Sequence, residues 1–143
     1  MNKRRNKMTG WIIALVIVAG LAIAGWISWS KLEQEHQEAR SLPLDRVDFG
    51  DLKDGVYHGH YEGGMYRWRR NDCEVTVASG KVADIKLVTS SDPGMENMDP
   101  KMLYDRVIKE QSLQVDTISG ATLTSKAYLQ AVENALVQSQ TNE

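Results

Sequence analysis

The segment from residue 116 to residue 125 is dense in groups that can do chemistry. It reads D-T-I-S-G-A-T-L-T-S and carries five hydroxyl side chains in ten positions. A serine or threonine hydroxyl caps a helix by accepting a hydrogen bond from the backbone. Gly120 and Ala121 lack bulk, so another group can approach the backbone closely between these hydroxyls. The segment is therefore a candidate either for helix capping or for an anion-binding site.

A helix is predicted directly after this segment. The next small and apolar residues recur at helical spacing and predict one buried face, made of Ala127, Tyr128, Ala131, Val132, Ala135 and Leu136. Unpaired N–H groups and the positive end of the helix dipole make a helix N-terminus a site for anions, above all for phosphate. The residue types alone leave a second interpretation open, in which Ser119, Thr122 and Thr124 or Ser125 are alternative helix caps.

The sequence before this helix predicts a small antiparallel sheet. Strands are expected over residues 55–61, 66–77 and 82–89, with residues 78–81 as a hairpin connection between the last two. In the third strand, one face is expected to carry Ala83, Ile85 and Leu87. This alternation is typical of a sheet that is covered on one side.

A further helix is predicted between the sheet and the hydroxyl-rich segment. Asp99 and Pro100 form a cap and first-turn pair, and the amphipathic pattern that follows ends near Gln111. The predicted fold class is α+β: an antiparallel sheet with packed helices, preceded by one N-terminal transmembrane helix.

The transmembrane helix is predicted from twenty uncharged residues, Gly10 to Trp29. At about 1.5 Å per residue they span roughly 30 Å, the thickness of the hydrocarbon core of a bilayer. Basic residues precede the span and acidic residues dominate after it, which predicts a cytoplasmic N-terminus. An alternative remains open, because Ala22-Ile23-Ala24 is an A-x-A signal for cleavage of a secretory signal peptide. Under either interpretation the remaining domain is expected outside the cytoplasm.

These patterns divide the chain into four parts. Residues 1–9 are expected to be a cytoplasmic basic tail, and residues 10–30 a transmembrane anchor. Residues 31–46 are rich in polar helix formers and are expected to form a stalk and linker. Residues 47–140 are expected to form the extracytoplasmic domain, which is long enough for a modest core.

Composition argues against several classes of function. The single cysteine, Cys73, excludes an internal disulfide and is expected to pack as a small apolar residue. The net charge is −2 although the N-terminal tail is basic, so the remaining domain is acidic and nucleic-acid binding is not expected. His58 and His60 lie two apart on a strand without a third ligand, so no metal site is predicted. No arrangement typical of hydrolytic catalysis is present.

The residues of the hydroxyl-rich segment resemble a known family motif. D-T-I-S-G-A-T at 116–122 is similar to the D-x-x-[ST]-G-A-[TS] signature of the FMN-binding domain family, found in peripheral flavin subunits of sodium-pumping quinone reductases and Rnf-type complexes. The resemblance extends to D-G-V-Y-H-G at 54–59 and to the hairpin sequence V-A-S-G-K-V-A-D-I-K-L-V. E-Q-S-L-Q-V-D before the motif and A-V-E-N-A-L in the last helix are similar as well. The resemblance covers most of residues 50–138.

This resemblance implies roles for individual residues of the motif. In the family, the hydroxyl of the last threonine carries FMN through a phosphoester bond, which a separate extracytoplasmic flavin transferase forms from FAD. By position, the attachment residue is Thr122. Asp116, Ser119, Gly120 and Ala121 would be recognised by the transferase and would surround the phosphate.

Two segments depart from the family pattern. Related subunits often have an E-T-P-G loop near the isoalloxazine ring, where this chain has Ser91-Asp92-Pro93-Gly94-Met95 and keeps only Pro93 and Gly94. Residues 61–72 are particular to this chain. Their three arginines (Arg67, Arg69 and Arg70) are interpreted as a solvated strand face, with contact to an acidic partner as the alternative. Tyr66 and Trp68 are interpreted as core residues, with Tyr66, Trp68 and Met95 flanking a flavin ring as the alternative.

The function expected from the resemblance and the topology is that of a membrane-anchored extracytoplasmic electron carrier with covalent FMN on Thr122. Its expected partners are a flavin transferase for maturation and redox partners in or outside the membrane. Such a protein is an electron-transfer flavoprotein rather than a stand-alone enzyme. Two alternatives remain: a sensor or assembly module of the same fold with loose or no flavin, and a small flavin reductase.

Overall fold

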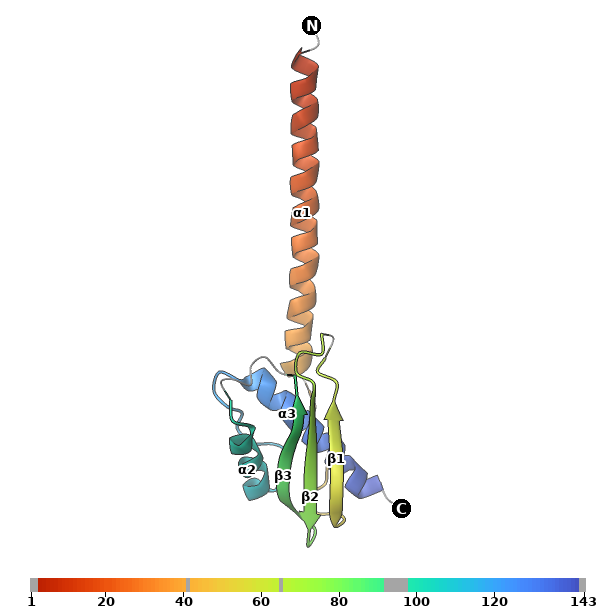
Figure 1. Ribbon diagram of the computed structural model, residues 1–143, viewed down its shortest axis with the longest axis vertical. Helices are drawn as coiled ribbons and strands as arrows, with labels where there is room; N and C mark the ends of the chain where they lie inside the picture. The colour runs from red at the N-terminus through yellow and green to blue at the C-terminus, as the bar shows by residue number, and fades with distance from the viewer. Residues whose placement is uncertain (1–2, 41, 65, 92–97, 142–143) are drawn as a thin grey trace. The chain divides into compact units, whose positions relative to one another are not determined.

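The computed structural model describes residues 3–40, 42–64, 66–91 and 98–141 of this chain. The chain divides into two compact units, Met1–His36 and Gln37–Glu143. Within the described residues, the second unit contains a three-stranded antiparallel sheet and two helices, and the first contains most of one long helix (Figure 1). The α+β class predicted from the sequence is therefore confirmed.

The long helix is α1 (Lys3–Arg40), 38 residues in length. Its segment Thr9–Gln34 is long and apolar enough to cross a membrane, and no part of its apolar window is buried inside the protein. A signal sequence near an N-terminus can also be a helix that is long and apolar enough to cross a membrane. The hydroxyl of Ser28 donates to the carbonyl of Ala24 at 2.9 Å, so this polar group is satisfied within the helix.

The sheet consists of β1 (Gly55–Tyr61), β2 (Asn71–Ala78) and β3 (Lys81–Ser90), paired as antiparallel neighbours in sequence order. Ser79 and Gly80 connect β2 to β3 with φ values of 54° and 70°. Two positive φ values in succession are typical of a type I′ turn, which suits the twist of a hairpin. The predicted hairpin and the predicted bounds of the first strand are confirmed.

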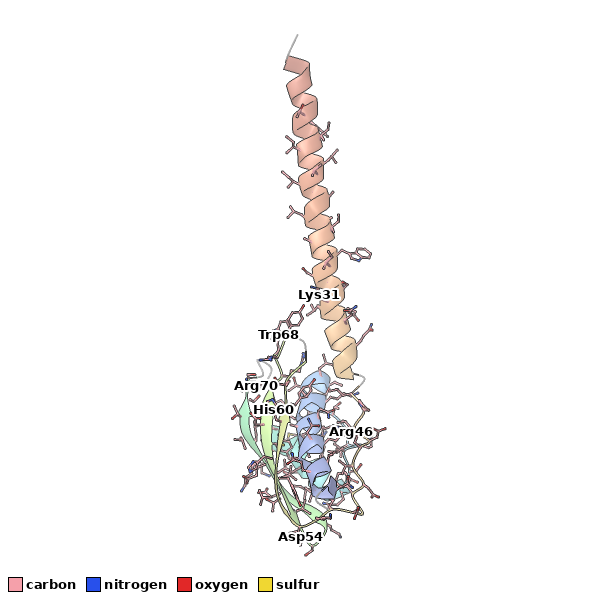
Figure 2. All side chains as sticks on the ribbon, turned by 90° about the vertical axis from the view of Figure 1, so that its right-hand side faces the viewer. Lys31, Arg46, Asp54, His60, Trp68 and Arg70 are labelled. Atoms are coloured by element: carbon pink, nitrogen blue, oxygen red, sulfur yellow. The ribbon has the colours of Figure 1, made fainter. Side chains whose placement is uncertain are left out.

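Asp54 holds this hairpin turn in place. Its carboxylate accepts a hydrogen bond from the N–H of Gly80 at 2.8 Å. Hydrogen bonds from the N–H groups of Gly80 and Ser79 hold the pKa of Asp54 below its ordinary value. Figure 2 shows Asp54 at the hairpin end of the sheet, with Trp68 and Arg70 at the opposite end. The aspartate of D-G-V-Y-H-G therefore has a structural role.

The prediction of one extended strand over residues 66–77 was wrong in its first part. β2 begins at Asn71, and residues 66–69 form turns, in which Arg67 has a φ of 55°. Such a positive φ is incompatible with an extended strand. The φ values of 89° at Gly63 and 76° at Gly64 agree with the turn that this glycine pair predicts. Tyr66 and Trp68, interpreted as core residues, are instead 38% and 44% exposed. Their rings stack on each other with centroids 5.1 Å apart.

The predicted inner face of the third strand was also partly wrong. Thr76 pairs with Asp84 and Val77 pairs with Val82, so Ala83 is an extra residue in a β-bulge. The bulge shifts the alternation by one position, so Ala83 is exposed and Val82 is buried in its place. Beyond the bulge, the predicted inward orientation holds, with Ile85 buried and Leu87 half-buried.

α2 (Pro100–Glu110) begins and ends as predicted. The carboxylate of Asp99 caps it by accepting from the N–H of Lys101 at 2.9 Å. Gln111 follows the helix with a φ of 48°. Its side-chain amide both accepts from the N–H of Val82 and donates to the carbonyl of Val82, each at 2.9 Å. The C-terminal end of α2 is thereby tied to β3.

α3 (Thr122–Thr141) covers one face of the sheet, packed mainly against β1 and β2, and α2 packs against β3 (Figure 1). The predicted apolar face of the last helix is confirmed, because its six residues are all at most 2% exposed: Ala127, Tyr128, Ala131, Val132, Ala135 and Leu136. Beneath it lie the inward-facing residues of the sheet, among them Cys73, Val75 and Val77. The core therefore lies between the sheet and the two helices.

Polar side chains of α3 also cover the outer edge of β1. The amide of Asn134 donates to the carbonyl of His60, and the amide of Gln138 donates to the carbonyl of His58, both at 2.8 Å. An edge strand otherwise presents unpaired backbone groups that can pair with another chain. α3 therefore protects this edge while its apolar face fills the core.

Two groups with potential reactivity lie inside the core. Cys73 is 1% exposed, and burial raises the pKa of its thiol to about 12. The thiolate is therefore absent at neutral pH, and Cys73 packs as a small apolar residue, as the sequence predicts. Tyr104 is also buried, and burial raises the pKa of its hydroxyl above the ordinary value. Its ring meets that of Tyr128 edge to face, with centroids 6.4 Å apart.

The linker before β1 is bound to the middle of α3. The guanidinium of Arg46 donates to the carboxylate of Glu133 at 2.8 and 3.0 Å, and the backbone N–H of Arg46 donates to the same carboxylate at 2.9 Å. Gln130 adds a fourth hydrogen bond at 2.7 Å. Glu133 is fully buried, so these donors replace the water that a carboxylate would otherwise bind.

Candidate functional site

The motif residues Gly120, Ala121 and Thr122 form the start of α3. The carbonyl of Ala121 accepts the first hydrogen bond of the helix, from the N–H of Ser125 at 2.8 Å. Ala121 is therefore the N-cap residue, and Thr122 is the first residue of the helix. Helix geometry leaves the N–H groups of Thr122 and the next two residues without a partner inside the helix.

Gly120 gives this helix start its shape. Its φ of 78° lies in the left-handed region, which a residue with a side chain adopts only at a cost. A β-carbon at Gly120 would meet no atom within 4 Å. The glycine is therefore required for the direction of the chain, and the space beside it is open. An incoming group can approach the backbone there.

A pocket of about 500 Å³ opens at this helix start. We call it the Thr122 pocket; it is lined by Arg69, Gly120, Ala121, Thr122, Leu123 and Thr124. Its volume lies within the range of small-molecule sites, about 300–1,000 Å³. The side chain of Thr122 is exposed, so its hydroxyl is accessible from this pocket. A hydroxyl, free N–H groups and an arginine together suit a phosphate ester.

Arg69 is the residue of this pocket that sequence reasoning missed. It comes from the loop between β1 and β2, far from the motif in the sequence, and was interpreted as part of a solvated strand face. The loop forms turns, and Arg69 lines the Thr122 pocket. The interpretation of Arg69 as part of a solvated strand face was therefore wrong. The cluster of three arginines was the available signal, but the sequence did not tell which of the three lies near Thr122.

The buried side chain of Asn71 fixes the backbone of Arg69 against α3. Asn71 is 1% exposed, and its amide N–H₂ donates to the carbonyl of Arg69 at 3.0 Å and to the carbonyl of Ala127 at 3.2 Å. One amide group therefore bridges the loop and the second turn of α3. Among the described residues, its Oδ1 has no hydrogen-bond partner, which costs about 1–3 kcal/mol for a buried acceptor.

The other hydroxyls of the segment are not equivalent to that of Thr122. Ser125 and Thr124 are buried, and the Oγ of Ser125 accepts from the N–H of Ile118 at 3.1 Å. The Ser125 hydroxyl therefore binds the loop before α3. It does not cap the N-terminus of α3, which was one of the roles considered from the sequence. Ser119 is exposed in the turn before the helix. Thr122 is thus the exposed hydroxyl that lines the pocket.

The remaining candidate residues lie elsewhere. Asp116 is exposed and lines a separate hollow together with Arg106, and its backbone carbonyl accepts from the guanidinium of Arg106 at 2.5 Å. The structure therefore does not bring the Asp116 carboxylate to the Thr122 pocket, although Asp116 remains available to a partner protein. Pro93 and Gly94 lie outside the described residues, as does Met95.

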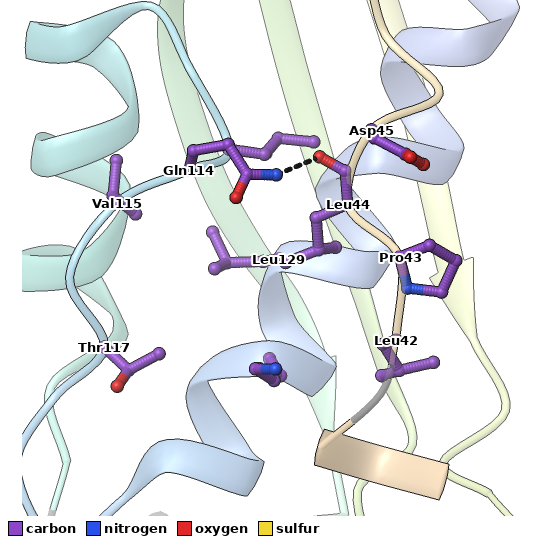
Figure 3. Close-up of a pocket in the computed structure, with 10 residues that line it drawn as sticks. Leu42, Pro43, Leu44, Asp45, Gln114, Val115, Thr117 and Leu129 are labelled. Carbon is purple, nitrogen blue, oxygen red and sulfur yellow. Dashed lines mark hydrogen bonds between the residues drawn. The ribbon is translucent and has the colours of Figure 1, made fainter.

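The segment before the motif is held by the linker. The side-chain amide of Gln114 donates to the carbonyl of Leu44 at 2.7 Å (Figure 3). Leu44 and Leu129 face each other across a hollow of about 270 Å³, which Thr117 also lines (Figure 3). This hollow contains no exposed hydroxyl of the helix start. Its residues position the chain that leads into the motif.

His60, in β1, interacts both with β2 and with the start of the loop between β1 and β2. Its Nδ1 lies 2.5 Å from the carboxylate of Asp72 and its Nε2 lies 2.9 Å from that of Glu62. Hydrogen bonds to Asp72 and then to Glu62 raise the pKa of His60 above 6.5, and the hydrogen bond from His60 lowers the pKa of Glu62. Arg67 lies 3.7 Å from the other oxygen of Glu62. This exposed cluster therefore favours protonated His60.

We predict that His60 titrates with a midpoint above its ordinary value of 6.5, and that Asp72→Asn lowers this midpoint. Because the pKa is raised in the folded state, the stabilisation is complete below the ordinary value and is lost as the pH rises through the folded-state pKa. Proton NMR of the His60 ring across the pH range measures the midpoint. Glu62→Gln should lower it less, because Asp72 is the larger cause. Equal midpoints in the parent and Asp72→Asn would contradict the pairing.

Comparison with known proteins identifies the domain that carries this pocket. The family model described as FMN-binding domain matches residues 68–137. Among solved structures, the crystal structure of the CPE2226 protein from Clostridium perfringens is similar with a TM-score of 0.52 and 20% sequence identity, covering 64% of this chain and 92% of that chain. At this identity the likeness concerns the fold alone. No curated protein matches the chain significantly.

The segment matched by the family model contains β2, β3, α2, the whole motif and most of α3. Both sides of the Thr122 pocket, Arg69 and the start of α3, therefore lie within the matched residues. Residues 68–137 of this chain are therefore identified as an FMN-binding domain.

Proposed function

We propose that this chain is a membrane-anchored electron carrier that faces away from the cytoplasm and holds FMN through a phosphoester on Thr122. The match of residues 68–137 to the FMN-binding domain model supports FMN as the cofactor. The observation that carries the covalent link is the place of Thr122, which is exposed at the start of α3 and lines a pocket beside Gly120. The last three residues of the D-T-I-S-G-A-T motif, Gly120, Ala121 and Thr122, line that pocket.

In the proposed attachment, a flavin transferase supplies FAD to the Thr122 pocket. The Oγ of Thr122 forms a bond to the flavin-side phosphorus, the P–O bond of the pyrophosphate breaks, AMP leaves, and the hydroxyl proton passes to solvent. The N–H groups at the start of α3 would donate to the phosphate oxygens. A β-carbon at Gly120 would meet no atom within 4 Å, so the phosphate would find the backbone open at this position. No oxidation or reduction takes place in this step.

When bound, FMN supplies the electron-transfer chemistry, and the protein supplies position and electrostatics. A covalent link suits a protein outside the cytoplasm, where a diffusible cofactor would be lost. The outward orientation is supported by the basic residues before the apolar segment Thr9–Gln34 and the acidic residues after it. The acceptor and donor would be redox partners in or near the membrane.

Intact-mass measurement of the full chain, produced together with a flavin transferase, tests this proposal. The parent is expected to gain the mass of FMN less one water, and Thr122→Ala is expected to gain nothing. Thr122→Ser keeps a hydroxyl at the same place and should retain the addition, and Thr89→Ala, an exposed threonine of β3, should behave as the parent. A parent chain without the added mass would refute the covalent attachment.

Flavin fluorescence of the denatured protein in a gel separates a covalent link from loose binding. Only a covalent adduct remains with the chain after denaturation, so the band of the parent should fluoresce and that of Thr122→Ala should not. Fluorescence in the native protein that is lost on denaturation would show that FMN binds without the ester. That result would favour a module of the same fold that binds flavin loosely.

A further inference from the structure

We infer that Arg69 is the residue of this chain that binds the phosphate at the flavin attachment site. This inference rests on the proposed attachment of FMN to Thr122. It adds a binding residue that lies outside the D-T-I-S-G-A-T motif, in the loop between β1 and β2. Arg69 and Thr122 line the same pocket from two elements that are far apart in the sequence.

The chemistry of the site favours an arginine at this place. A phosphodiester carries one negative charge, and the planar guanidinium group can donate two parallel hydrogen bonds to two phosphate oxygens. The N–H groups at the start of α3 approach the phosphate from the Thr122 side, and Arg69 lines the pocket from the loop side. Together they compensate a charge that a helix start alone holds only weakly.

The backbone of Arg69 is more firmly placed than that of an ordinary surface loop. Asn71 bridges its carbonyl to that of Ala127 in α3, so the loop and the helix start are held at a fixed separation. The buried Oδ1 of Asn71 has no partner among the described residues, so this arrangement carries an energetic cost. The end of the loop is held as well, because the N–H of Ser91 donates to the carbonyl of Arg70 at 3.0 Å.

The neighbouring arginines of the loop differ from Arg69 in exposure, and neither of them is among the residues that line the Thr122 pocket. Arg67 is exposed, and its side chain lies 3.7 Å from Glu62. Arg70 is exposed as well, whereas Arg69 is half-buried. Among the residues that line the Thr122 pocket in the described part of the chain, Arg69 is the one with a positive charge. Arg67 is therefore a matched control for Arg69: it has the same side chain and lies in the same loop, but it has a different environment.

The test measures both attachment and the environment of the phosphate. The full chain in detergent is incubated with FAD and a flavin transferase, and the added mass is followed over time for the parent, Arg69→Ala, Arg69→Lys and Arg67→Ala. Arg69→Ala should be modified about tenfold more slowly, as expected for the loss of one charge-assisted hydrogen-bonded pair. Arg69→Lys should recover part of the rate because it keeps the charge without the planar group. Arg67→Ala should equal the parent.

Phosphorus NMR of the fully modified proteins then reports on the phosphate itself. The resonance of Arg69→Ala should be displaced from that of the parent in the folded state and coincide with it after denaturation, whereas Arg67→Ala should match the parent in both. An unchanged resonance in Arg69→Ala overturns the assignment, even if attachment is slower, because Arg69 would then act only on the transferase. A parent chain that gains no flavin overturns the proposed function, and this inference falls with it.

Discussion

Replacing Gly59 with alanine is expected to destabilise the folded unit Gln37–Glu143 by about 3 kcal/mol or more, because the added methyl group overlaps α3. In an ordinary strand the same change would stabilise by about 0.5–1 kcal/mol, since glycine loses more backbone entropy on folding. At this position, however, a β-carbon would lie 1.9 Å from the carbonyl oxygen of Ala131 and 2.9 Å from the β-carbon of Ala135. A helix backbone cannot move aside as a flexible side chain can, so α3 must shift away from the sheet.

Denaturant unfolding of the full chain, followed by circular dichroism in detergent, measures this effect as a lower midpoint. Gly50→Ala is a suitable control, because its β-carbon would approach the Asp48 carboxylate at 3.1 Å, and this exposed side chain can move away. We expect it to change stability by less than about 1 kcal/mol. An unfolding midpoint of Gly59→Ala equal to that of the parent would contradict the close packing of α3 on β1.

The last helix and the hairpin could be predicted from the sequence because local patterns determine them. The apolar face of α3 repeats at helical spacing, and each of its predicted residues is buried as expected. Ser79-Gly80 has the turn chemistry that a two-residue hairpin requires, and Asp99-Pro100 has that of a helix start. In each case residues that are close in the sequence determine the local structure, and contacts with distant residues do not change it.

The segment 66–70 and the inner face of β3 could not be predicted in this way. Aromatic and arginine residues after Gly64 are compatible with a strand, and only the positive φ of Arg67 and the pairing of Tyr61 with Asn71 show that the chain turns. The β-bulge at Ala83 depends on how two strands pair. Pairing is a non-local property, and one extra residue changes which side chains face the core.

In the candidate site, too, some residues could be predicted from local sequence and others could not. The motif predicted Gly120, Ala121 and Thr122, and the structure brings these three together in one pocket. Arg69 could not be predicted, because its place depends on the turns of its loop and on the bridge made by Asn71. The sequence also did not separate the exposed hydroxyl of Thr122 from the buried ones that follow. Burial depends on how α3 packs against the rest of the domain.

Replacing Arg46 with alanine is expected to lower the free energy of unfolding by about 3 kcal/mol. Glu133 is fully buried, and the guanidinium of Arg46 is the cation bound to it. After the replacement, the backbone N–H of residue 46 and the amide of Gln130 still donate to the carboxylate, but its charge is no longer compensated. The linker would also lose its side-chain attachment to α3. Thermal or denaturant unfolding of the full chain measures the loss.

A double-mutant cycle with Glu133→Gln tests whether the buried charge is the cause. If it is, adding Glu133→Gln to Arg46→Ala should restore part of the stability, because a neutral amide is less costly to bury than an unpaired carboxylate. Additive losses would contradict this explanation. Arg67→Ala provides the surface reference, since Arg67 and Glu62 are both largely exposed and 3.7 Å apart. Such a pair contributes about 0–1 kcal/mol, so a comparable loss at Arg46 would show that water reaches Glu133.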